Sequence, residues 1–416
     1  MNETIKHRIE QIKRGEVPTG YKKSKLGVLP GDWTSMTVGE CLEKVEKPVA
    51  VEPDKLYTQI GIRSHGKGLF YKEPVSGESL GNKSVFWVEP DCFVLNIVFA
   101  WEQAIGKTTE NEIGMIGSHR FPMFRPIDNR VYIDYLISYL LTKRGTDILK
   151  FASPGGAGRN RTLGQDRFLN SKIILPTIDE QKKIAEILAT QDKVIALKEK
   201  LLEEKKKQKK YLMQQLLTGK KRLPGFTDRY FAQKMKTIIR ETSFRSNDGI
   251  NRNVMSVSNV KGFVSQTEQF DKIVASNDTS NYKIVKYGTF AYNPSRINVG
   301  SLALYKGNQE IIVSPMYSTF IALGNINMDY LLYWFKSFGF TSQLKKYLSG
   351  SVRNSLSISD LLLFDIRLPY IEEQNAIVEV LSNADKEISI IQKSIDQEKQ
   401  KKKALMQLLL TGIVRV

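Results

Sequence analysis

The sequence predicts an α+β protein made of two similar globular domains joined by two long helices, which form an antiparallel coiled coil with approximate internal two-fold symmetry. Three observations support this prediction. Residues 175–219 and 368–412 align without a gap and agree at 22 of 45 positions. Both copies carry a coiled-coil pattern, and the regions before them share a looser common plan. A repeat at this level indicates a duplicated unit.

Apolar residues recur in alternating steps of four and three along both copies, which is the 3.5-residue period of a coiled coil. The seam predicted from this period contains Ile184, Leu188, Ile195, Leu202, Leu212, Leu216, Ile377, Leu381, Ile388, Ile391, Ile395, Leu405 and Leu409. Charged residues interrupt both copies at matching positions, 205/209 and 398/402, which indicates that the helices are partners in a fixed register. A helix of about 40 residues is roughly 60 Å long. We therefore expect a spacer; the alternative is an amphipathic helix packed on its own domain.

The length of 416 residues favours two to four domains. We place the boundaries where the composition changes. The predicted parts are an N-terminal helix (1–20), a first globular domain (21–174), a first long helix (175–220), a second globular domain (221–367) and a second long helix (368–416).

Local patterns predict the elements of each part. Isoleucines at coiled-coil spacing predict a helix at 2–14, which Pro18 and Gly20 end. In the first domain we expect strands at 56–62, 84–88, 92–98 and 172–174 and a helix at 131–142. The second domain repeats this plan loosely, with residues 93–96, 134–136 and 158–160 matching 290–293, 329–331 and 352–354. Because the helices match better than the domains, the two domains should differ in what they bind.

The formal charge of +18, from 62 basic and 44 acidic residues, predicts a polyanionic partner. A basic protein without such a partner is the alternative. Cys41 and Cys92 lie far apart and make no metal-binding spacing, which favours a reducing compartment. The sequence has no run of 18 apolar residues and does not open with a secretory signal, so we expect a cytoplasmic protein.

Basic and polar residues gather where loops are expected, and such side chains suit DNA. Arginine and lysine bind guanine in the major groove, and asparagine binds adenine bidentately. The candidates for DNA binding are Arg63, Ser64, His65, Lys67, Lys107, Arg120, Arg159, Asn160, Arg161, Asn259, Lys261, Asn293, Ser295, Arg296, Asn298, Arg353 and Asn354. Of these, 293–298 interrupts two predicted strands and should be an exposed loop. For any single candidate, a solvated loop residue is the alternative.

The motifs of catalysis are missing. Asn293-Pro294-Ser295-Arg296 lacks the aromatic residue of an adenine methyltransferase box, which would stack the flipped base. The glycines at 155–158 are not followed by a phosphate-binding Gly-Lys-Ser motif. Acidic residues do not cluster as a nuclease requires, and the three histidines form no ligand set. We therefore expect no catalytic site, no metal and no cofactor.

The arrangement resembles the specificity subunit of type I restriction–modification systems. The resemblance rests on two variable domains, each followed by Leu-Pro-x-Ile-Asp/Glu-Glu-Gln-x-x-Ile, a long helix and Leu-Leu-Thr-Gly. The segment from Gly20-Tyr21 to Leu29-Pro30-Gly31-Asp32-Trp33 is similar to that family's usual start of the first domain. The family implies two target-recognition domains, each reading one half of a split DNA sequence, and an antiparallel helical spacer that sets the unread gap.

The resemblance also implies partners. These are double-stranded DNA, two modification subunits with the adenine methyltransferase site and, in the full complex, translocating restriction subunits. The chain itself would be non-catalytic. Two alternatives remain, a coiled-coil scaffold whose heads do not bind DNA and a self-contained DNA methyltransferase or nuclease.

Overall fold

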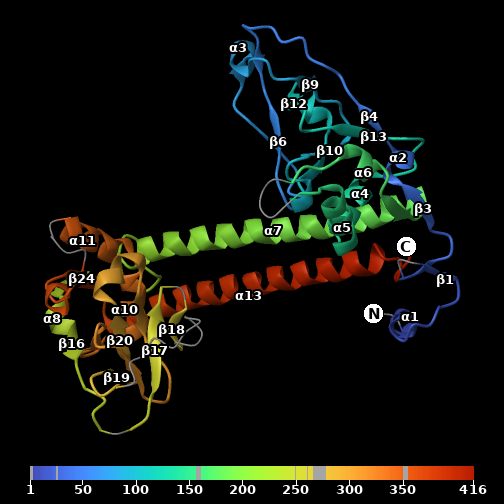
Figure 1. The fold of residues 1–416 in the computed structure, drawn as a ribbon. Helices are drawn as coiled ribbons and strands as arrows, with labels where there is room; N and C mark the ends of the chain where they lie inside the picture. Colours follow the sequence, from blue (N-terminus) through green and yellow to red (C-terminus); the bar gives the residue numbers. More distant parts are fainter. Residues whose placement is uncertain are drawn as a thin grey trace. The chain divides into compact units, whose positions relative to one another are not determined.

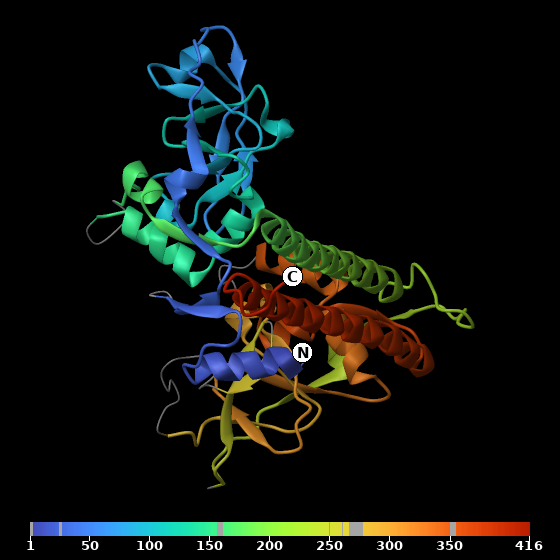
Figure 2. The same cartoon turned by 90° about the vertical axis from the view of Figure 1, so that its right-hand side faces the viewer.

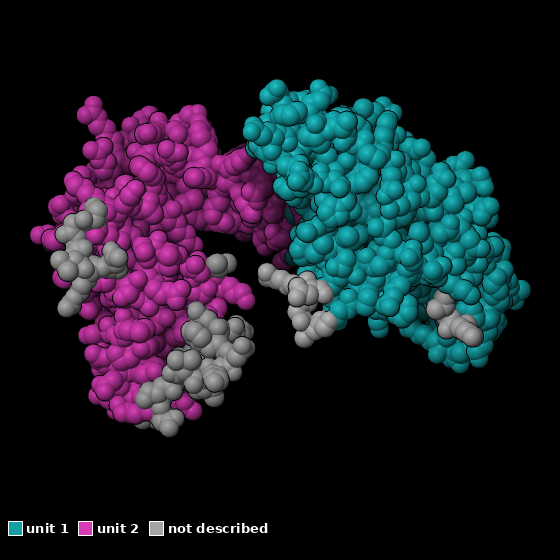
Figure 3. All heavy atoms as spheres, turned by 45° about the horizontal axis from the view of Figure 1, so that its top comes forward, with its two compact units in different colours: residues 1–198, 394–416 teal, residues 199–393 magenta. Residues whose placement is uncertain are grey.

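The computed structural model describes residues 3–24, 27–155, 161–248, 250–259, 261–265, 278–349 and 355–416. The chain divides into two compact units (Figure 3). Unit 1 contains residues 1–198 and 394–416, and unit 2 contains 199–393. Two long helices, α7 (Ile178–Leu216) and α13 (Ile371–Leu409), run through both units (Figure 1). Each unit therefore holds a globular head together with part of each long helix.

Unit 1 begins with a short helix and continues with short strands and helices. Its helices are α1 (Glu3–Lys13), α2 (Val38–Cys41), α3 (Gly77–Leu80), η1 (Ala100–Glu102), η2 (Glu110–Glu112), α4 (Ile133–Leu140), α5 (Lys143–Ala152) and α6 (Gln165–Leu169). Its strands are β1 (Tyr21–Ser24), β2 (Gly27–Pro30), β3 (Thr34–Thr37), β4 (Leu42–Val45), β5 (Leu56–Tyr57), β6 (Ile60–Ile62), β7 (Leu69–Tyr71), β8 (Val75–Ser76), β9 (Val85–Trp87), β10 (Phe93–Leu95), β11 (Ile105–Lys107), β12 (Ile116–Ser118), β13 (Met123–Pro126) and β14 (Lys172–Leu175). The single strand expected at 56–62 is wrong, because β5 pairs with β8 whereas β6 pairs with β7.

Unit 2 has a similar order of elements. Its helices are α8 (Met235–Ile238), η3 (Pro294–Val299), α10 (Met328–Phe335), α11 (Phe338–Ser349) and α12 (Ile358–Leu361). Its strands are β15 (Phe231–Lys234), β16 (Ile239–Thr242), β17 (Asn253–Ser258), β18 (Gly262–Ser265), β19 (Lys283–Val285), β20 (Thr289–Tyr292), β21 (Leu302–Leu304), β22 (Ile311–Val313), β23 (Ser318–Ala322) and β24 (Asp365–Leu368).

Each head is built on the same four-stranded antiparallel sheet. The strand order is β11-β10-β13-β4 in unit 1 and β21-β20-β23-β16 in unit 2. In both heads an opening strand pairs with the strand before the long helix, β3 with β14 and β15 with β24. The predicted α+β class with two similar domains is confirmed, and the duplication extends from the helices into the heads.

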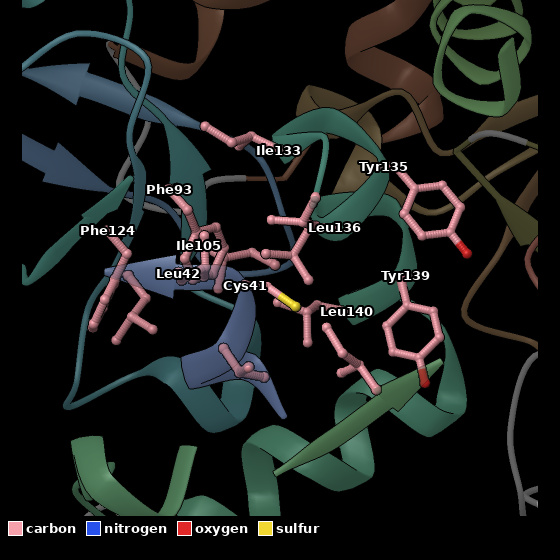
Figure 4. Close-up of a cluster of buried hydrophobic side chains, with 14 of the residues drawn as sticks. Cys41, Leu42, Phe93, Ile105, Phe124, Ile133, Tyr135, Leu136, Tyr139 and Leu140 are labelled. Atoms are coloured by element: carbon pink, nitrogen blue, oxygen red, sulfur yellow. The ribbon is translucent and has the colours of Figure 1, made fainter. Parts of the chain in front are cut away.

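The core of each head continues into the long helices. In unit 1, α4 buries five side chains in the apolar cluster, Ile133, Tyr135, Leu136, Tyr139 and Leu140 (Figure 4). The same apolar cluster contains Ile184 near the start of α7 and Leu409 at the end of α13. The cluster in unit 2 likewise joins the start of α13 to the end of α7. Because burying apolar surface is the main favourable term in folding, each head anchors one helix by its beginning and the other by its end.

The predicted coiled coil of the two long helices is confirmed. All positions of the predicted heptad seam on α7 and α13 are buried or half-buried, whereas most residues between them are exposed. In unit 1, Asp192 pairs with Lys402 at 2.6 Å and Lys198 with Glu398 at 2.7 Å. The residue numbers run in opposite directions, so the two helices are antiparallel there (Figures 1 and 2).

The same holds in unit 2, where Lys205 pairs with Glu387 at 2.8 Å and Lys209 with Asp385 at 2.5 Å. The two copies of the repeat are 193 residues apart, so Asp192 corresponds to Asp385 and Lys402 to Lys209. The Lys209–Asp385 pair is therefore the counterpart of the Asp192–Lys402 pair. The charged interruptions of the seam therefore pair with residues of opposite charge on the partner helix, which fixes the register. In the described part of the chain, no helix is both long and apolar enough to cross a membrane.

A buried ion pair closes the helix pair in unit 1. Glu180, in the first turn of α7, is 4% exposed in its side chain, and both of its carboxylate oxygens accept hydrogen bonds from Arg415, at 2.7 and 2.9 Å. Arg415 lies just beyond the end of α13 and also binds Asp32 at 2.7 and 2.9 Å. The indole of Trp33 donates to Glu180 at 3.2 Å. Hydrogen bonds from Arg415 hold the pKa of Asp32 below its ordinary value.

Unit 2 carries the equivalent pair. Glu373, in the first turn of α13, is 2% exposed in its side chain and binds Arg222, which lies beyond the end of α7, at 2.5 and 2.7 Å. Tyr230 donates to the carbonyl of Leu216 at 2.8 Å, and the Arg222 guanidinium lies 4.9 Å from the centre of its ring. Both Glu–Arg pairs connect the beginning of one long helix to the chain just after the end of the other.

The glutamine that follows each of these glutamates fixes the head to its helix. Gln181 accepts from the amide of Tyr132 at 2.8 Å and donates to the carbonyls of Arg130 and Pro176. Gln374 accepts from the amide of Asn327 at 3.0 Å. Tyr132 and Asn327 are the N-caps of α4 and α10. The two residues of the repeated Glu-Gln dipeptide therefore have separate roles. The glutamate binds an arginine just after the other long helix, and the glutamine binds the head.

We expect Arg415→Ala to destabilise unit 1 by about 3–5 kcal/mol, because it leaves Glu180 buried without its cation. Lys401→Ala serves as a matched control: Lys401 is exposed and lies 3.9 Å from Glu398, so its loss should cost less than about 1 kcal/mol. Hydrogen exchange of the amides at the start of α7 and the end of α13 measures the difference. Equal protection in the two variants would show that the pair does not hold the helix ends.

Candidate nucleic-acid interface

The segment that follows β20, which the sequence predicts to be an exposed loop, is a capped turn. Its backbone forms η3 because the Asn293 side chain accepts from the amide of Ser295 at 3.0 Å and Pro294 presets the first helical φ. Ile297 is buried and anchors the turn in the core. Arg296 and Asn298, on either side of it, are exposed, as are Ser295 and Val299. Of the candidates in this turn, Ser295, Arg296 and Asn298 are thus exposed and Asn293 is half-buried, and their backbone is fixed.

A hairpin lies against this turn in unit 2. Strands β17 and β18 pair in register up to Ser258 and Gly262, so Asn259 and Lys261 lie at the tip and are exposed. The Ser301 hydroxyl, at the end of the turn, donates to the carbonyl of Val257 at 3.1 Å. The structure therefore brings two of the candidate segments of unit 2 together.

In unit 1 the candidates at 63–67 form the tip of the β6–β7 hairpin. Arg63 donates to the carbonyl of Leu69 at 2.6 Å, and its guanidinium lies 5.1 Å from the Phe70 ring centre. His65 has a φ of +62°, its amide donates to the carbonyl of Glu102, and Ser64 donates to the Glu102 carboxylate at 3.1 Å. Lys67 is exposed. The hairpin tip is thus tied to η1.

Two further candidates meet the same segment of unit 1, the connection between β10 and β11 at residues 96–104. The amide of Ile97 donates to the carbonyl of Arg120, whose side chain is exposed. The guanidinium of Arg161 lies 5.5 Å from the centre of the Trp101 ring. Loops from three places in the sequence therefore surround the 96–104 connection.

Lys107, another candidate of unit 1, forms ion pairs within the head. Its ammonium group is 3.1 Å from Asp134 and 3.8 Å from Asp91, and it lies 5.7 Å from the centre of the Tyr132 ring. Burial lowers the pKa of Lys107, but the hydrogen bond with Asp134 and the charges of Asp134, Tyr132 and Asp91 together outweigh it, and the pKa is raised. Lys107 thus joins β11 to the first turn of α4. The remaining candidates, Arg159, Asn160, Arg353 and Asn354, lie outside the described residues.

The connection at 96–104 has the same backbone as the turn at 293–301 in unit 2. Both begin at the asparagine of a repeated Phe-x-x-Asn and have nine residues, and in both the next-to-last residue, Gln103 or Gly300, has a positive φ. Their backbone hydrogen bonds match after a shift of 197, as in Asn96–Ala104, Ala104–Phe99 and Ile105–Gln103 against Asn293–Ser301, Ser301–Arg296 and Leu302–Gly300. The two turns are therefore structural equivalents.

Sequence reasoning missed two residues that this equivalence reveals. Phe99 and Trp101 occupy the positions of Arg296 and Asn298, and Phe99 is 38% exposed. The signal was present in the match between 93–96 and 290–293. The sequence alone does not single out Phe99 and Trp101, because aromatic residues are usually part of the core.

Few groups among the described residues are suited to metal binding or covalent chemistry. Among them, no group of His, Cys, Asp or Glu side chains is arranged to hold a metal ion. Burial raises the pKa of Cys41 to about 11, and burial also raises that of Cys92, so neither thiol is a ready nucleophile. A cavity of about 1120 Å³ lies between α5 and α13 in unit 1, and its lining has a single carboxylate, Asp147, among several lysines.

Known proteins share both the sequence pattern and the fold. The family model of the type I restriction modification DNA specificity domain matches residues 85–207 and 231–399. The type I restriction enzyme MjaVIII specificity subunit of Methanocaldococcus jannaschii is 25% identical over 414 residues, which cover 93% of this chain and 94% of that protein.

Two solved structures have the same fold. The HsdS subunit from Thermoanaerobacter tengcongensis is 17% identical with a TM-score of 0.54, over 93% of this chain and 98% of that one. A chain from a study of complex assembly and conformational transition of the type I R-M system is also 17% identical, with a TM-score of 0.59, over 93% of this chain and 99% of that one. With two matched domains that together span more than half of its length, this chain belongs to the family of type I restriction–modification DNA specificity subunits.

Proposed function

We propose that this chain reads a bipartite DNA sequence, one half-site with each head, and that the paired long helices set the unread gap. The family supplies target recognition in DNA. We assign the two target-recognition domains to residues 21–174 and 221–367, the spacer helices to 175–220 and 368–416, and the N-terminal helix to 1–20.

One observation carries this proposal. The two heads present an equivalent turn on the same backbone, but the side chains at its two matching positions differ: exposed Phe99 and half-buried Trp101 in one head, exposed Arg296 and Asn298 in the other. The long helices, in contrast, agree at nearly half of their positions. A shared frame with different exposed groups is what two half-sites of different sequence require, because base edges are distinguished by donor, acceptor and methyl patterns.

The charge of the chain supports a DNA partner. A surplus of 18 positive charges favours association with phosphates, and this contribution weakens as salt rises. Exposed cations lie next to both turns, Lys67 and Arg120 in unit 1 and Lys261 in unit 2. We assign these three to phosphate contacts, which position the protein without reading sequence.

We propose further that the chain is non-catalytic and acts with partner subunits. Two modification subunits with an adenine methyltransferase site supply methylation, and translocating restriction subunits join them in the full complex. The buried thiols and the scarcity of clustered carboxylates and histidines in the described residues support this division of labour. The proposal places the chain in the cytoplasm, together with the DNA that it reads.

Methylome sequencing of cells with and without the gene tests the proposed function. We expect adenine methylation at one bipartite sequence to disappear with the gene and to return when the gene is restored. The purified chain, freed of partners, should bind duplex DNA in a salt-dependent way and transfer no methyl groups. Turnover by the pure chain would instead indicate a self-contained enzyme, and an unchanged methylome with no duplex binding would indicate a scaffold.

Removal of one heptad from each long helix tests the spacer. Deleting residues 196–202 and 392–398 removes Lys198 together with its partners Ser394 and Glu398 and leaves the Asp192–Lys402 pair in place. The helix pair shortens by about 10 Å. We expect the unread gap to shorten by about three base pairs at 3.4 Å each, with both half-sites unchanged. The methylome reads out both quantities, and altered half-sites would mean that the helices themselves read bases.

Arg296→Ala tests base reading by the second head. We expect a loss of about 1–3 kcal/mol in discrimination at one position of one half-site, because a bidentate arginine contact to guanine is worth about that much. Arg296→Lys should not restore it, since an ammonium group lacks the planar fork of the guanidinium. Arg367→Ala, an exposed arginine of β24, is the control. Competition binding by the complex on single-base variants measures discrimination; uniform weakening across all variants would reassign Arg296 to phosphate.

A further inference from the structure

We infer that the first head reads its half-site through an apolar contact, in which Phe99 packs against the 5-methyl group of a thymine in the major groove. The inference rests on the proposed function and deepens it, because it names the kind of base edge that this head recognises. It follows from the equivalence of the two turns, from the exposure of Phe99 and from the groups around it.

The equivalence places Phe99 where the second head carries Arg296. The amides of Ala104 and Ser301 donate to the carbonyls of Phe99 and Arg296 at 3.1 and 3.2 Å. The amides of Phe99 and Arg296 both donate, at 3.0 Å, to the carbonyl of the asparagine three residues earlier. The residue after each is buried: Ala100 is 0% exposed and Ile297 is 3% exposed. The backbone therefore holds both side chains at the same place on the sheet.

The physical character of position 99 differs from that of 296. A phenylalanine offers no hydrogen bond, so it cannot read a guanine or adenine edge. It can gain free energy only by removing apolar surface from water. The one large apolar group on a base edge in the major groove is the thymine methyl group, and phenylalanine is among the side chains that contact it.

The surroundings of Phe99 keep it available for such a contact. Trp101, two residues on, is fixed because its indole donates to the carbonyl of Val98 at 3.1 Å. Arg161 covers the Trp101 ring at 5.5 Å, a cation–π arrangement that orders the guanidinium. The Glu102 carboxylate, the nearest acid in the sequence, accepts from Ser64. With Lys67 and Arg120 on neighbouring loops, the exposed Phe99 lies within a basic surface, where phosphate contacts bring DNA close.

Replacing thymine by uracil tests the inference, because uracil lacks only the 5-methyl group. The first half-site contains at least one thymine, since the adenine methylated there pairs with one. We expect the complex, purified with its partner subunits, to lose about three- to fivefold in affinity when one particular thymine of this half-site becomes uracil, the effect of one buried methyl group. Binding competition against the unmodified duplex, one thymine at a time, finds that position.

Two variants complete a cycle between protein and DNA. Phe99→Ala should bind the unmodified duplex about three- to fivefold more weakly and should bind thymine and uracil duplexes equally. Phe99→Leu, which keeps an apolar side chain, should retain part of the difference. Ile113→Ala is the matched control, because Ile113 is 58% exposed in the same unit but lies after η2, and it should behave as the wild type.

Either of two outcomes would overturn the inference: no thymine of the first half-site responds to uracil, or the response is the same in Phe99→Ala as in the wild type. Neither outcome touches the proposed function, because the wild-type complex would still bind both half-sites. A failure of the proposed function shows itself differently, as a complex whose binding does not depend on either half-site.

Discussion

The buried pairing of Glu180 with Arg415 and of Glu373 with Arg222 is the constraint on which the rest of the molecule depends. Each carboxylate begins one long helix, and each arginine follows the other, so both ends of the helix pair are closed by the same contact. A carboxylate that is 2–4% exposed requires its cation, because an unpaired charge at that depth is strongly destabilising. The pairs therefore specify which helix ends meet. The heptad seam then continues the same register of α7 against α13 along the helices.

This constraint separates the frame from the reading surface. Gln181 and Gln374 bind the head beside each pair, and the four-stranded sheet then positions the turn after β10 or β20. Substitution at an exposed position of the turn leaves the sheet, the cap and the helix contacts in place. The heads can thus diverge in sequence while the helices stay alike, which is the pattern that the chain displays.

The sequence predicted the helices well and the heads poorly, for physical reasons. A 3.5-residue period repeated over about 40 residues is a strong local signal, and duplication doubles it. The Glu-Gln motif was visible, but its roles were not, because Arg415 lies 235 residues from Glu180 and Arg222 lies 151 from Glu373. The strands of the heads are only two to six residues long, too short for a period-2 pattern to set their bounds. The ion pairs of Lys107 could not be predicted from the sequence, because its acidic neighbours come from elsewhere in the chain, Asp91 before β10 and Asp134 in α4.

The turn also explains why a reading position need not be polar. In both heads the turn contains a buried residue, Ala100 or Ile297. An exposed residue, Phe99 or Arg296, comes just before it, and Trp101 or Asn298 comes just after it. The buried residue fixes the backbone, so the backbone that carries the neighbouring side chains has little conformational freedom left to lose on binding. A preorganised position can then gain from whatever its side chain offers, hydrogen bonds from an arginine or apolar area from a phenylalanine. A search for charged residues identifies Arg296 as such a position but not Phe99, although the backbone hydrogen bonds at the two positions are the same.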